Sequence, residues 1–420
     1  MFSPTALSRP VLDSFQSLLV IVVLAGTRQT SIFRYITVLL LTPILYLQVI
    51  QPPAENLHQW LTENHAPFTC LQHINLLAIT SIDIQNDNNG VLPGILGRLK
   101  RAIVYQFNQR GIGTVHQVKN IPPIPGFYHK KKGYLSHKYR FVVRQLCLFA
   151  WQYLIVDVGC SLWHQLPDRE RFALFGPGTE WTIVNAEAQH WKTRIIAVFL
   201  FWMTIRNAMD LPYRLGSAVL TAAGATSMHD WPPLFGTLWD LYTLRNFWGK
   251  WWHQQMRWTL SSHSSFITRR LLKLPRQSLR ERYLNNAIVH ALSALIHVNG
   301  WRVAQLHDGY KGCSLFYMSF VGGYMIEDFV QNIWATVRWR KSYSRNEGKS
   351  QPPVLFENLM GFLWVGLFLT VTTPWWCYPL LRRYSYTLPL SFVGAFGMNN
   401  VLAAISIGAL ILKTQFDANI

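Results

Sequence analysis

A bundle of membrane-spanning α-helices is the fold class that this sequence predicts. Half of its 420 residues are hydrophobic and 14% are aromatic, while only 14% carry a charge, against about 25% in an average soluble domain. The apolar residues are gathered into long runs, and basic residues lie between those runs. Apolar runs of this length are typical of helices that cross a bilayer. We therefore expect an all-α, multi-pass membrane protein that forms a single domain over residues 1–420.

The distribution of charge and the spacing of the cysteines argue against nucleic-acid binding, a metal site and a disulfide framework. A formal net charge of +19 would suggest nucleic-acid binding in a soluble protein. Here the cations alternate with apolar runs, so we assign them to membrane orientation and to contact with anionic membrane lipids, and we predict no nucleic-acid partner. The five cysteines are widely spaced and form no CxxC pair. They predict neither a metal site nor a disulfide framework.

About nine apolar segments approach the ~20 residues that a spanning helix needs. They are the runs at 18–26, 35–50, 68–84, 141–163, 195–223, 286–300, 313–334, 359–379 and 390–412. Polar residues and a proline interrupt the run at 195–223, namely Arg206, Asp210, Pro212 and Arg214. Such interruptions are tolerated in a membrane where protein or a cavity covers the backbone. We therefore expect a broken or re-entrant element in this run.

Three basic stretches set the predicted orientation. They lie at 98–144, 245–282 and 338–349, and the first contains no acidic residue. Cytoplasmic loops carry an excess of Lys and Arg, so we place all three stretches in the cytosol. The segment 51–66 has no Lys or Arg and should be non-cytoplasmic. The N-terminus then faces the lumen and the C-terminus the cytosol.

The stretch 231–257 reads WPPLFGTLWDLYTLRNFWGKWWHQQMR. Its tryptophans and three cations, Arg245, Lys250 and Arg257, crowd round His253. This mixture suits neither a lipid-facing span nor a solvated loop, and it is typical of a site at a membrane interface. A diphosphate-bearing substrate would approach such a site from the cytosol.

A second polar feature lies on the apolar run that follows, 286–300. His290, Ser293 and His297 stand at i, i+3 and i+7, so a helix places all three on one stripe. Polar stripes inside a membrane face a cavity, and a neutral histidine there can take a proton from an alcohol that attacks an activated carbonyl. The alternative is that His297 donates a structural hydrogen bond to a backbone carbonyl.

Together the two features resemble the wax synthase branch of the membrane-bound O-acyltransferase superfamily. The resemblance rests on PPLFG at 232–236, RNFWGKWWHQQMR at 245–257 and SALIHVNG at 293–300, so the core motifs span 231–300. Lys250 stands where the family usually has arginine, and Ala294 where glycine is common. The first departure keeps the charge and the second keeps a small residue. The compact architecture is similar to that of fungal members that acetylate secondary metabolites.

What the resemblance implies is acyl transfer from coenzyme A to a hydroxyl inside a membrane-embedded tunnel. By this analogy His297 is the catalytic base, and His253 holds the acceptor or polarises the carbonyl. The donor-binding residues that it implies are Arg245, Lys250, Trp252 and Arg257. Those that line the tunnel are Trp248, His290 and Ser293. Membrane orientation and headgroup contact alone would also account for the cations.

We therefore expect an enzyme of the endoplasmic reticulum that moves an acyl group, with acetyl favoured, from acyl-CoA to a lipophilic alcohol such as a terpenoid. Acyl-CoA is a co-substrate, and no bound cofactor is expected. Acylation of long-chain alcohols to wax esters is the alternative within the same chemistry. A transporter built on a broken helix at 206–214, and a non-catalytic scaffold, are the alternatives of other classes. A transporter would be expected to contain an inverted repeat, which we do not find in the sequence.

Overall fold

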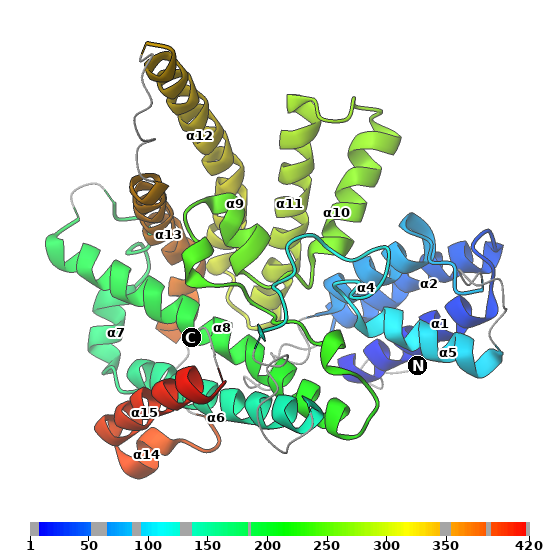
Figure 1. Ribbon diagram of the computed structural model, residues 1–420, viewed down its shortest axis with the longest axis horizontal. Helices are drawn as coiled ribbons and strands as arrows, with labels where there is room; N and C mark the ends of the chain where they lie inside the picture. The colour runs from blue at the N-terminus through cyan, green and yellow to red at the C-terminus, as the bar shows by residue number, and fades with distance from the viewer. Residues whose placement is uncertain are drawn as a thin grey trace. The chain divides into compact units, whose positions relative to one another are not determined.

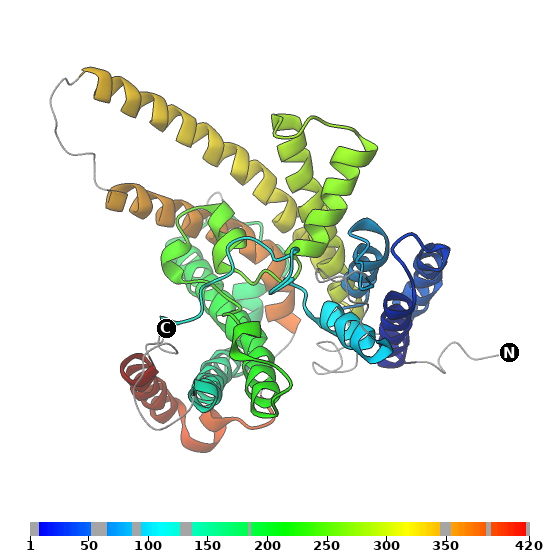
Figure 2. The ribbon, with the colours of Figure 1, turned by 45° about the vertical axis from the view of Figure 1, so that its right-hand side comes forward.

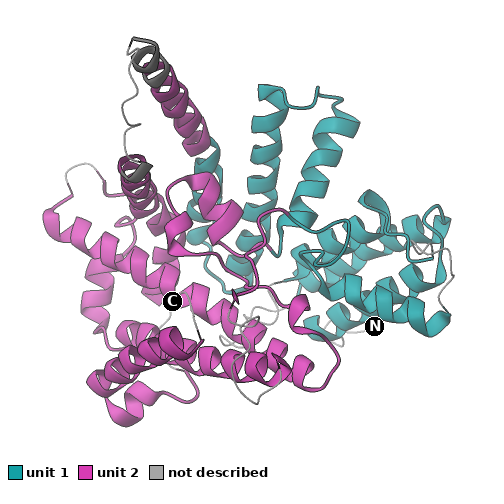
Figure 3. Cartoon of the chain, in the orientation of Figure 1, with its two compact units in different colours: residues 1–118, 255–321 teal, residues 119–254, 322–420 magenta. Residues whose placement is uncertain are grey.

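The computed structural model describes residues 8–51, 65–85, 94–126, 137–183, 186–344, 354–383 and 388–416. The regular structure of these residues is helical throughout (Figure 1), which confirms the predicted all-α class for this part of the chain. The chain divides into two compact units, each made of two separate stretches (Figure 3). Unit 1 comprises residues 1–118 and 255–321, and unit 2 comprises residues 119–254 and 322–420.

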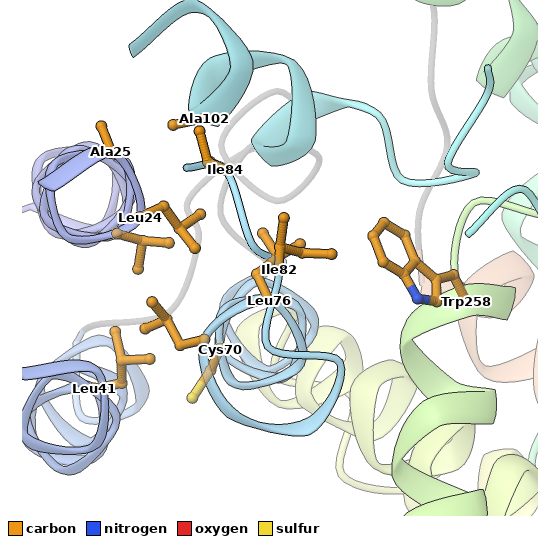
Figure 4. Close-up of a cluster of buried hydrophobic side chains, with 11 residues drawn as sticks. Leu24, Ala25, Leu41, Cys70, Leu76, Ile82, Ile84, Ala102 and Trp258 are labelled. Atoms are coloured by element: carbon orange, nitrogen blue, oxygen red, sulfur yellow. The ribbon is translucent and has the colours of Figure 1, made fainter. Parts of the chain in front are cut away.

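The first stretch of unit 1 is a group of helices packed on one apolar core. They are α1 (Arg9–Gly26), α2 (Ile32–Val49), α4 (Ala66–Ile74) with its π-helical continuation η2 (Asn75–Ile79), and α5 (Ile95–Phe107). On α1, Leu12, Gln16, Val20 and Leu24 are buried, because a spacing of four residues keeps side chains on one helix face. Figure 4 shows Leu24 in the core with Leu41 of α2 and Leu76 of η2.

The second stretch of unit 1 contributes a helical hairpin. Helix α10 (Arg257–Ser265) continues through η7 (Phe266–Leu271), and the chain returns along α11 (Leu279–Val303), which lies beside α10 in both ribbon views (Figures 1 and 2). An ion pair of 2.8 Å between Arg269 and Glu281 links the two limbs. Trp258 of α10 belongs to the core of Figure 4, so the hairpin is anchored on the N-terminal helices. Helix α12 (Gly309–Ser344) begins in this unit.

Unit 2 is built on two long neighbouring helices, α6 (His137–His164) and α8 (Ala188–Ala222). Helix α13 (Val354–Arg383) packs on α8, where the indole Nε1 of Trp202 donates to Thr373 Oγ1 at 3.1 Å. The C-terminal helices α14 (Phe392–Phe396) and α15 (Met398–Phe416) lie against α6. The unit also contains the short helix α7 (Asp168–Phe175) and the remainder of α12.

The predicted break in the run 195–223 is wrong, because α8 is one continuous helix of 35 residues. Two of the polar side chains that interrupt it, Asp210 and Arg214, bond to each other and to α6. Asp210 Oδ2 accepts from Arg214 Nε at 2.9 Å and from Gln152 Nε2 at 2.8 Å, and Arg214 Nη1 donates to Gln145 Oε1 at 2.8 Å. Buried polar groups that find such partners need no break in the backbone. The transporter reading thus loses its structural support.

Five helices are long and apolar enough to cross a membrane: α1, α2, α6, α8 and residues 356–383 of α13. Helices also form at the other predicted runs, but the apolar helix at 66–79 is shorter, and α11, α12 and α15 are not among the five. Residues 52–64, which make up most of the predicted non-cytoplasmic loop, lie outside the described residues. So do Lys130, Lys131 and Lys132 of the first basic stretch and residues 345–349 of the third.

Candidate functional site

The tryptophan-rich stretch forms a short, tightly capped turn in unit 2. Thr243 caps it, since its Oγ1 accepts from the backbone N–H of Asn246 at 3.0 Å, and the chain then passes through α9 (Leu244–Asn246) into the π-helical η6 (Phe247–Trp251). The carboxylate of Glu327 on α12 accepts from the N–H of Leu244 at 2.5 Å and from the indole Nε1 of Trp364 at 3.0 Å. A buried carboxylate therefore ties the start of the motif to two long helices.

The aromatic side chains of this turn are core residues of unit 2. Phe247, Trp251 and Trp252 are 0%, 1% and 5% exposed. They surround Trp202 of α8, whose ring centroid lies 5.0 Å from that of Phe247 and 4.8 Å from that of Trp252. These three side chains therefore pack in the interior of unit 2, in contact with other rings. The sequence cue was aromatic content, which core and interface share.

The segment before the turn runs back along α8. The Trp231 ring packs edge-on against Tyr213 at 5.0 Å, and the Tyr213 hydroxyl donates to the carbonyl oxygen of Pro232 at 2.6 Å. Further along the segment, the Phe235 ring lies under the guanidinium of Arg206, 5.0 Å from its centroid. Residues 231–235 therefore run along α8 from Tyr213 to Arg206, and the turn that follows packs on α8 at Trp202.

His253 follows the turn and lies against the same segment. Its ring centroid is 6.0 Å from that of Phe235, with the ring planes at 84°, and 5.3 Å from that of Trp252. The residue is partly buried. The structure therefore brings His253, Trp252 and the PPLFG segment together within unit 2.

The three predicted donor-binding cations differ in their surroundings. Arg245 forms an ion pair of 2.7 Å with Asp328 of α12, and its guanidinium lies 4.8 Å from the ring of Tyr324. The Lys250 ammonium stands 5.8 Å from the ring centroid of Tyr242. Arg257 belongs to unit 1, at the start of α10, where burial lowers the pKa of its guanidinium. The cations are thus divided between the two units, and Arg245 already has a carboxylate.

The polar stripe of the second element lies on α11 in unit 1, on the face that meets the first turns of α12. The His290 ring stacks on Phe320 at 5.5 Å with the planes at 9°, and the His297 ring lies 4.7 Å from that of Tyr317. The side chain of Ser293, between them, is hydrogen-bonded to the Tyr317 hydroxyl. The predicted helix stripe therefore exists, and aromatic side chains of α12 border it.

The tautomer of His297 follows from its backbone contact. Its Nδ1 lies 2.8 Å from the carbonyl oxygen of Ser293. A carbonyl oxygen only accepts hydrogen bonds, so a neutral His297 must carry its proton on Nδ1, and Nε2 then presents a lone pair. The structural hydrogen bond that stood as the alternative to catalysis is therefore present, and it also prepares the other ring nitrogen to act as a base.

Comparison with known proteins places this chain among acyltransferases. A family model described as the membrane bound O-acyl transferase family matches residues 231–319, which contain both elements. Acetyltransferase cdmC of Talaromyces verruculosus is 67% identical over 100% of each chain. The chain belongs to the membrane bound O-acyl transferase family. Acetyltransferase nanB of Aspergillus nanangensis is 43% identical over 94% of this chain and 95% of that protein, and acetyltransferase TRI7 of Fusarium sporotrichioides is 34% identical over 85% and 82%.

Family membership and the five apolar helices identify this acyltransferase as a membrane enzyme. The structure also adds residues that sequence reasoning missed. Tyr317 and Glu327 lie on an apolar run that we had counted only as a span, and their contacts are with residues distant in sequence. Arg206 was noticed only as an interruption of a helix. An ionisable side chain in an apolar run was its one available signal.

Proposed function

We propose that this acyltransferase moves an acetyl group from acetyl-CoA to a hydroxyl of a lipophilic acceptor, a terpenoid or a related secondary metabolite, in the endoplasmic reticulum membrane. Three relatives that match most of the chain are named acetyltransferases, which supports the acyl group. A fold rich in apolar helices supports an acceptor that reaches the enzyme through the bilayer. The single observation that carries the chemistry is the contact between His297 Nδ1 and the Ser293 carbonyl.

In the proposed reaction His297 acts as a general base through Nε2. As the acceptor oxygen attacks the thioester carbonyl, Nε2 takes the hydroxyl proton, while Nδ1–H stays bonded to Ser293 and helps to stabilise the imidazolium. The tetrahedral intermediate collapses, the C–S bond breaks, and the departing thiolate of coenzyme A takes the proton from Nε2. The acetyl ester and free coenzyme A leave, and His297 regains its neutral form.

The remaining predicted residues take roles that their surroundings support. His253, which is partly buried beside Phe235, would bind the acceptor hydroxyl or the thioester carbonyl. The tunnel would be lined by Trp248, His290 and Ser293. Trp252 supports the His253 ring at 5.3 Å. Lys250 and Arg257 would bind donor phosphates. Arg245, already paired with Asp328, would instead hold the motif on α12.

The architecture we propose is the one typical of the wax synthase branch, with about nine spans and an internal tunnel. Helices α11, α12, α15 and the shorter α4–η2 element would add to the five apolar spans. A helix can cross with fewer apolar residues where its polar side chains face protein, as they do on α11.

Microsomes that contain the expressed protein would test this function. They would be supplied with acetyl-CoA or palmitoyl-CoA and a panel of terpenoid and fatty alcohols, and the esters would be identified by mass spectrometry. We expect acetyl esters of terpenoid alcohols. Preference for palmitoyl-CoA and fatty alcohols would favour wax ester synthesis. Absence of ester with every pair would contradict the proposal.

A further inference from the structure

Arg206 is a cation on an apolar helix, and its local charge is not balanced. It lies on α8, one of the five helices apolar enough to span a membrane. The charged residues that act on it are Asp210 and Arg214, on the same helix. Two guanidinium groups therefore lie near one carboxylate, and the sum of the three charges is +1. A charge inside a membrane is costly unless it is paired, and such residues commonly mark a functional site.

The one carboxylate is already committed to the other arginine. Asp210 Oδ2 accepts from Arg214 Nε and Nη2 at 2.9 and 2.8 Å and from Gln152 Nε2 at 2.8 Å. Arg206 makes no ion pair with it. The Nε atom of Arg206 is buried and has no hydrogen-bond partner within the described ranges. A buried donor without a partner is rare in native proteins and calls for an explanation.

The position of Arg206 supplies that explanation. Its guanidinium lies over the Phe235 ring of the PPLFG segment, 5.0 Å from the centroid, and that centroid is 6.0 Å from the centroid of the His253 ring. The unbalanced charge is therefore held by the motif that carries one of the two histidines proposed for catalysis. An aromatic face attracts the cation but offers no oxygen acceptor, so this contact leaves the Nε–H of Arg206 without a hydrogen bond.

We propose that Arg206 is a donor-recognition residue whose guanidinium binds an anionic oxygen of acetyl-CoA. This inference rests on the proposed function. Two oxygens of the donor have the required chemistry. A phosphate oxygen is anionic before the reaction, and the thioester oxygen becomes anionic as the acceptor attacks. Either would balance the excess charge when the donor is bound.

Kinetics with two acetyl donors, acetyl-CoA and S-acetylpantetheine, distinguish the phosphate oxygen from the thioester oxygen. S-acetylpantetheine keeps the thioester but lacks the phosphates of acetyl-CoA. If Arg206 binds phosphate, Arg206→Gln raises KM for acetyl-CoA about 10- to 100-fold, the range for a lost charge-assisted hydrogen bond, and leaves S-acetylpantetheine kinetics unchanged. If Arg206 binds the thioester oxygen, kcat falls by a similar factor with both donors. Wild-type kinetics of Arg206→Gln with both donors would overturn the assignment.

A second variant guards against loss of folding. Arg206→Met removes the charge but keeps the length of the side chain. Since Asp210 is paired with Arg214 and not with Arg206, we expect Arg206→Met to unfold at the same or a higher temperature than wild type in detergent, while it loses donor recognition as Arg206→Gln does. A lower unfolding temperature with unchanged kinetics would mean that Arg206 serves only to pair Asp210, which contradicts the proposal.

Arg214→Met is the matched control on the same helix. Arg214 has its carboxylate and Gln145, so its loss should lower stability and leave the donor KM of the folded fraction unchanged. Failure of the proposed function would look different. Wild-type protein would then turn over no acetyl donor, and the Arg206 inference would be decided by the stability of Arg206→Met and by thermal shifts with coenzyme A.

Discussion

The Nδ1 atom of His297 and the carbonyl oxygen of Ser293 lie 2.8 Å apart on successive turns of α11. The same serine binds the Tyr317 hydroxyl through its side chain, and the Tyr317 ring lies 4.7 Å from the His297 ring. Ser293 and Tyr317 therefore limit both the tautomer and the tilt of the imidazole. A base whose ring is held in this way loses little orientational freedom when the acceptor arrives.

Replacing His297 tests the base directly. His297→Ala should lower turnover per enzyme molecule by about 10²-fold or more, the range for a lost general base. Acetyl-CoA binding should change little. Initial rates of ester formation in microsomes, normalised to protein abundance, give the first quantity, and thermal shifts with coenzyme A give the second. Near-normal turnover would remove His297 from catalysis.

His290→Ala is the control on the same stripe. His290 is buried against Phe320, one stacked contact in the core of unit 1. We expect its loss to lower abundance while turnover per molecule falls far less than in His297→Ala. Equal losses in the two variants would mean that the stripe acts through packing.

Tyr317→Phe separates positioning from packing. The ring stays, and the hydrogen bond to Ser293 is lost. A net contribution of about 1 kcal/mol predicts a fall in kcat of roughly fivefold. If Tyr317 acts by positioning His297, KM for donor and acceptor should stay unchanged. A rise in KM without a fall in kcat would assign Tyr317 to substrate binding instead.

Parts of this site could be predicted from sequence because local geometry alone decides them. The stripe at 290, 293 and 297 follows from the helical period, and apolar runs become helices because the backbone must bond to itself where water is scarce. Neither inference requires knowledge of a neighbouring helix. The motif around His253 was noticed through its composition and assigned through a family resemblance.

Other features depend on contacts between distant residues, and the sequence did not reveal them. Arg214 suggested a helix break because its partner Gln145 lies on another helix. The contact of Trp251 with Trp202 could not be predicted, because nothing in the local sequence says which rings will meet. Tyr317 was hidden in an apolar run, since its role depends on how α12 meets α11.

Glu327 should be a structural support of the motif. Its carboxylate accepts from Leu244 N and Trp364 Nε1 at 2.5 and 3.0 Å, and Glu327→Ala would leave two donors without it. We expect a loss of about 2 to 4 kcal/mol in the free energy of unfolding, measured on detergent-solubilised protein.

Glu357→Ala is the control. Glu357 also accepts from an indole, that of Trp334 at 2.8 Å, but at an exposed position. It should cost about 0.5 kcal/mol or less. Equal losses would contradict the assignment.

Membrane orientation gives a test that is independent of catalysis. Epitope tags near Lys131, Pro275 and Asn346 should be accessible from the cytosol in selectively permeabilised cells, and a tag near Glu55 should be protected. Pro275 lies in the connection between η7 and α11, and the other three positions lie outside the described residues. Protection of the tag at Pro275 would invert the α10–α11 hairpin and place Arg257 on the side away from cytosolic acetyl-CoA.

Gly236 should be the less replaceable of the two glycines in residues 231–257. Its N–H donates to the carbonyl oxygen of Trp251 at 3.0 Å, and a Cβ added there would clash with the Lys250 carbonyl oxygen and stand 3.2 Å from Trp251 Cα. Both are backbone atoms that cannot turn aside, so Gly236→Ala must push the segment away from the turn that carries His253. We expect activity to fall more than 10-fold, because displacements of about 1 Å can cost 10²-fold, together with lower abundance. Gly249→Ala is the control in the neighbouring motif at 245–257. An added Cβ there meets nothing within 4 Å, so this variant should retain near wild-type activity. If both alanine variants behave alike in the microsomal assay, close backbone contact at Gly236 does not hold the motif in place.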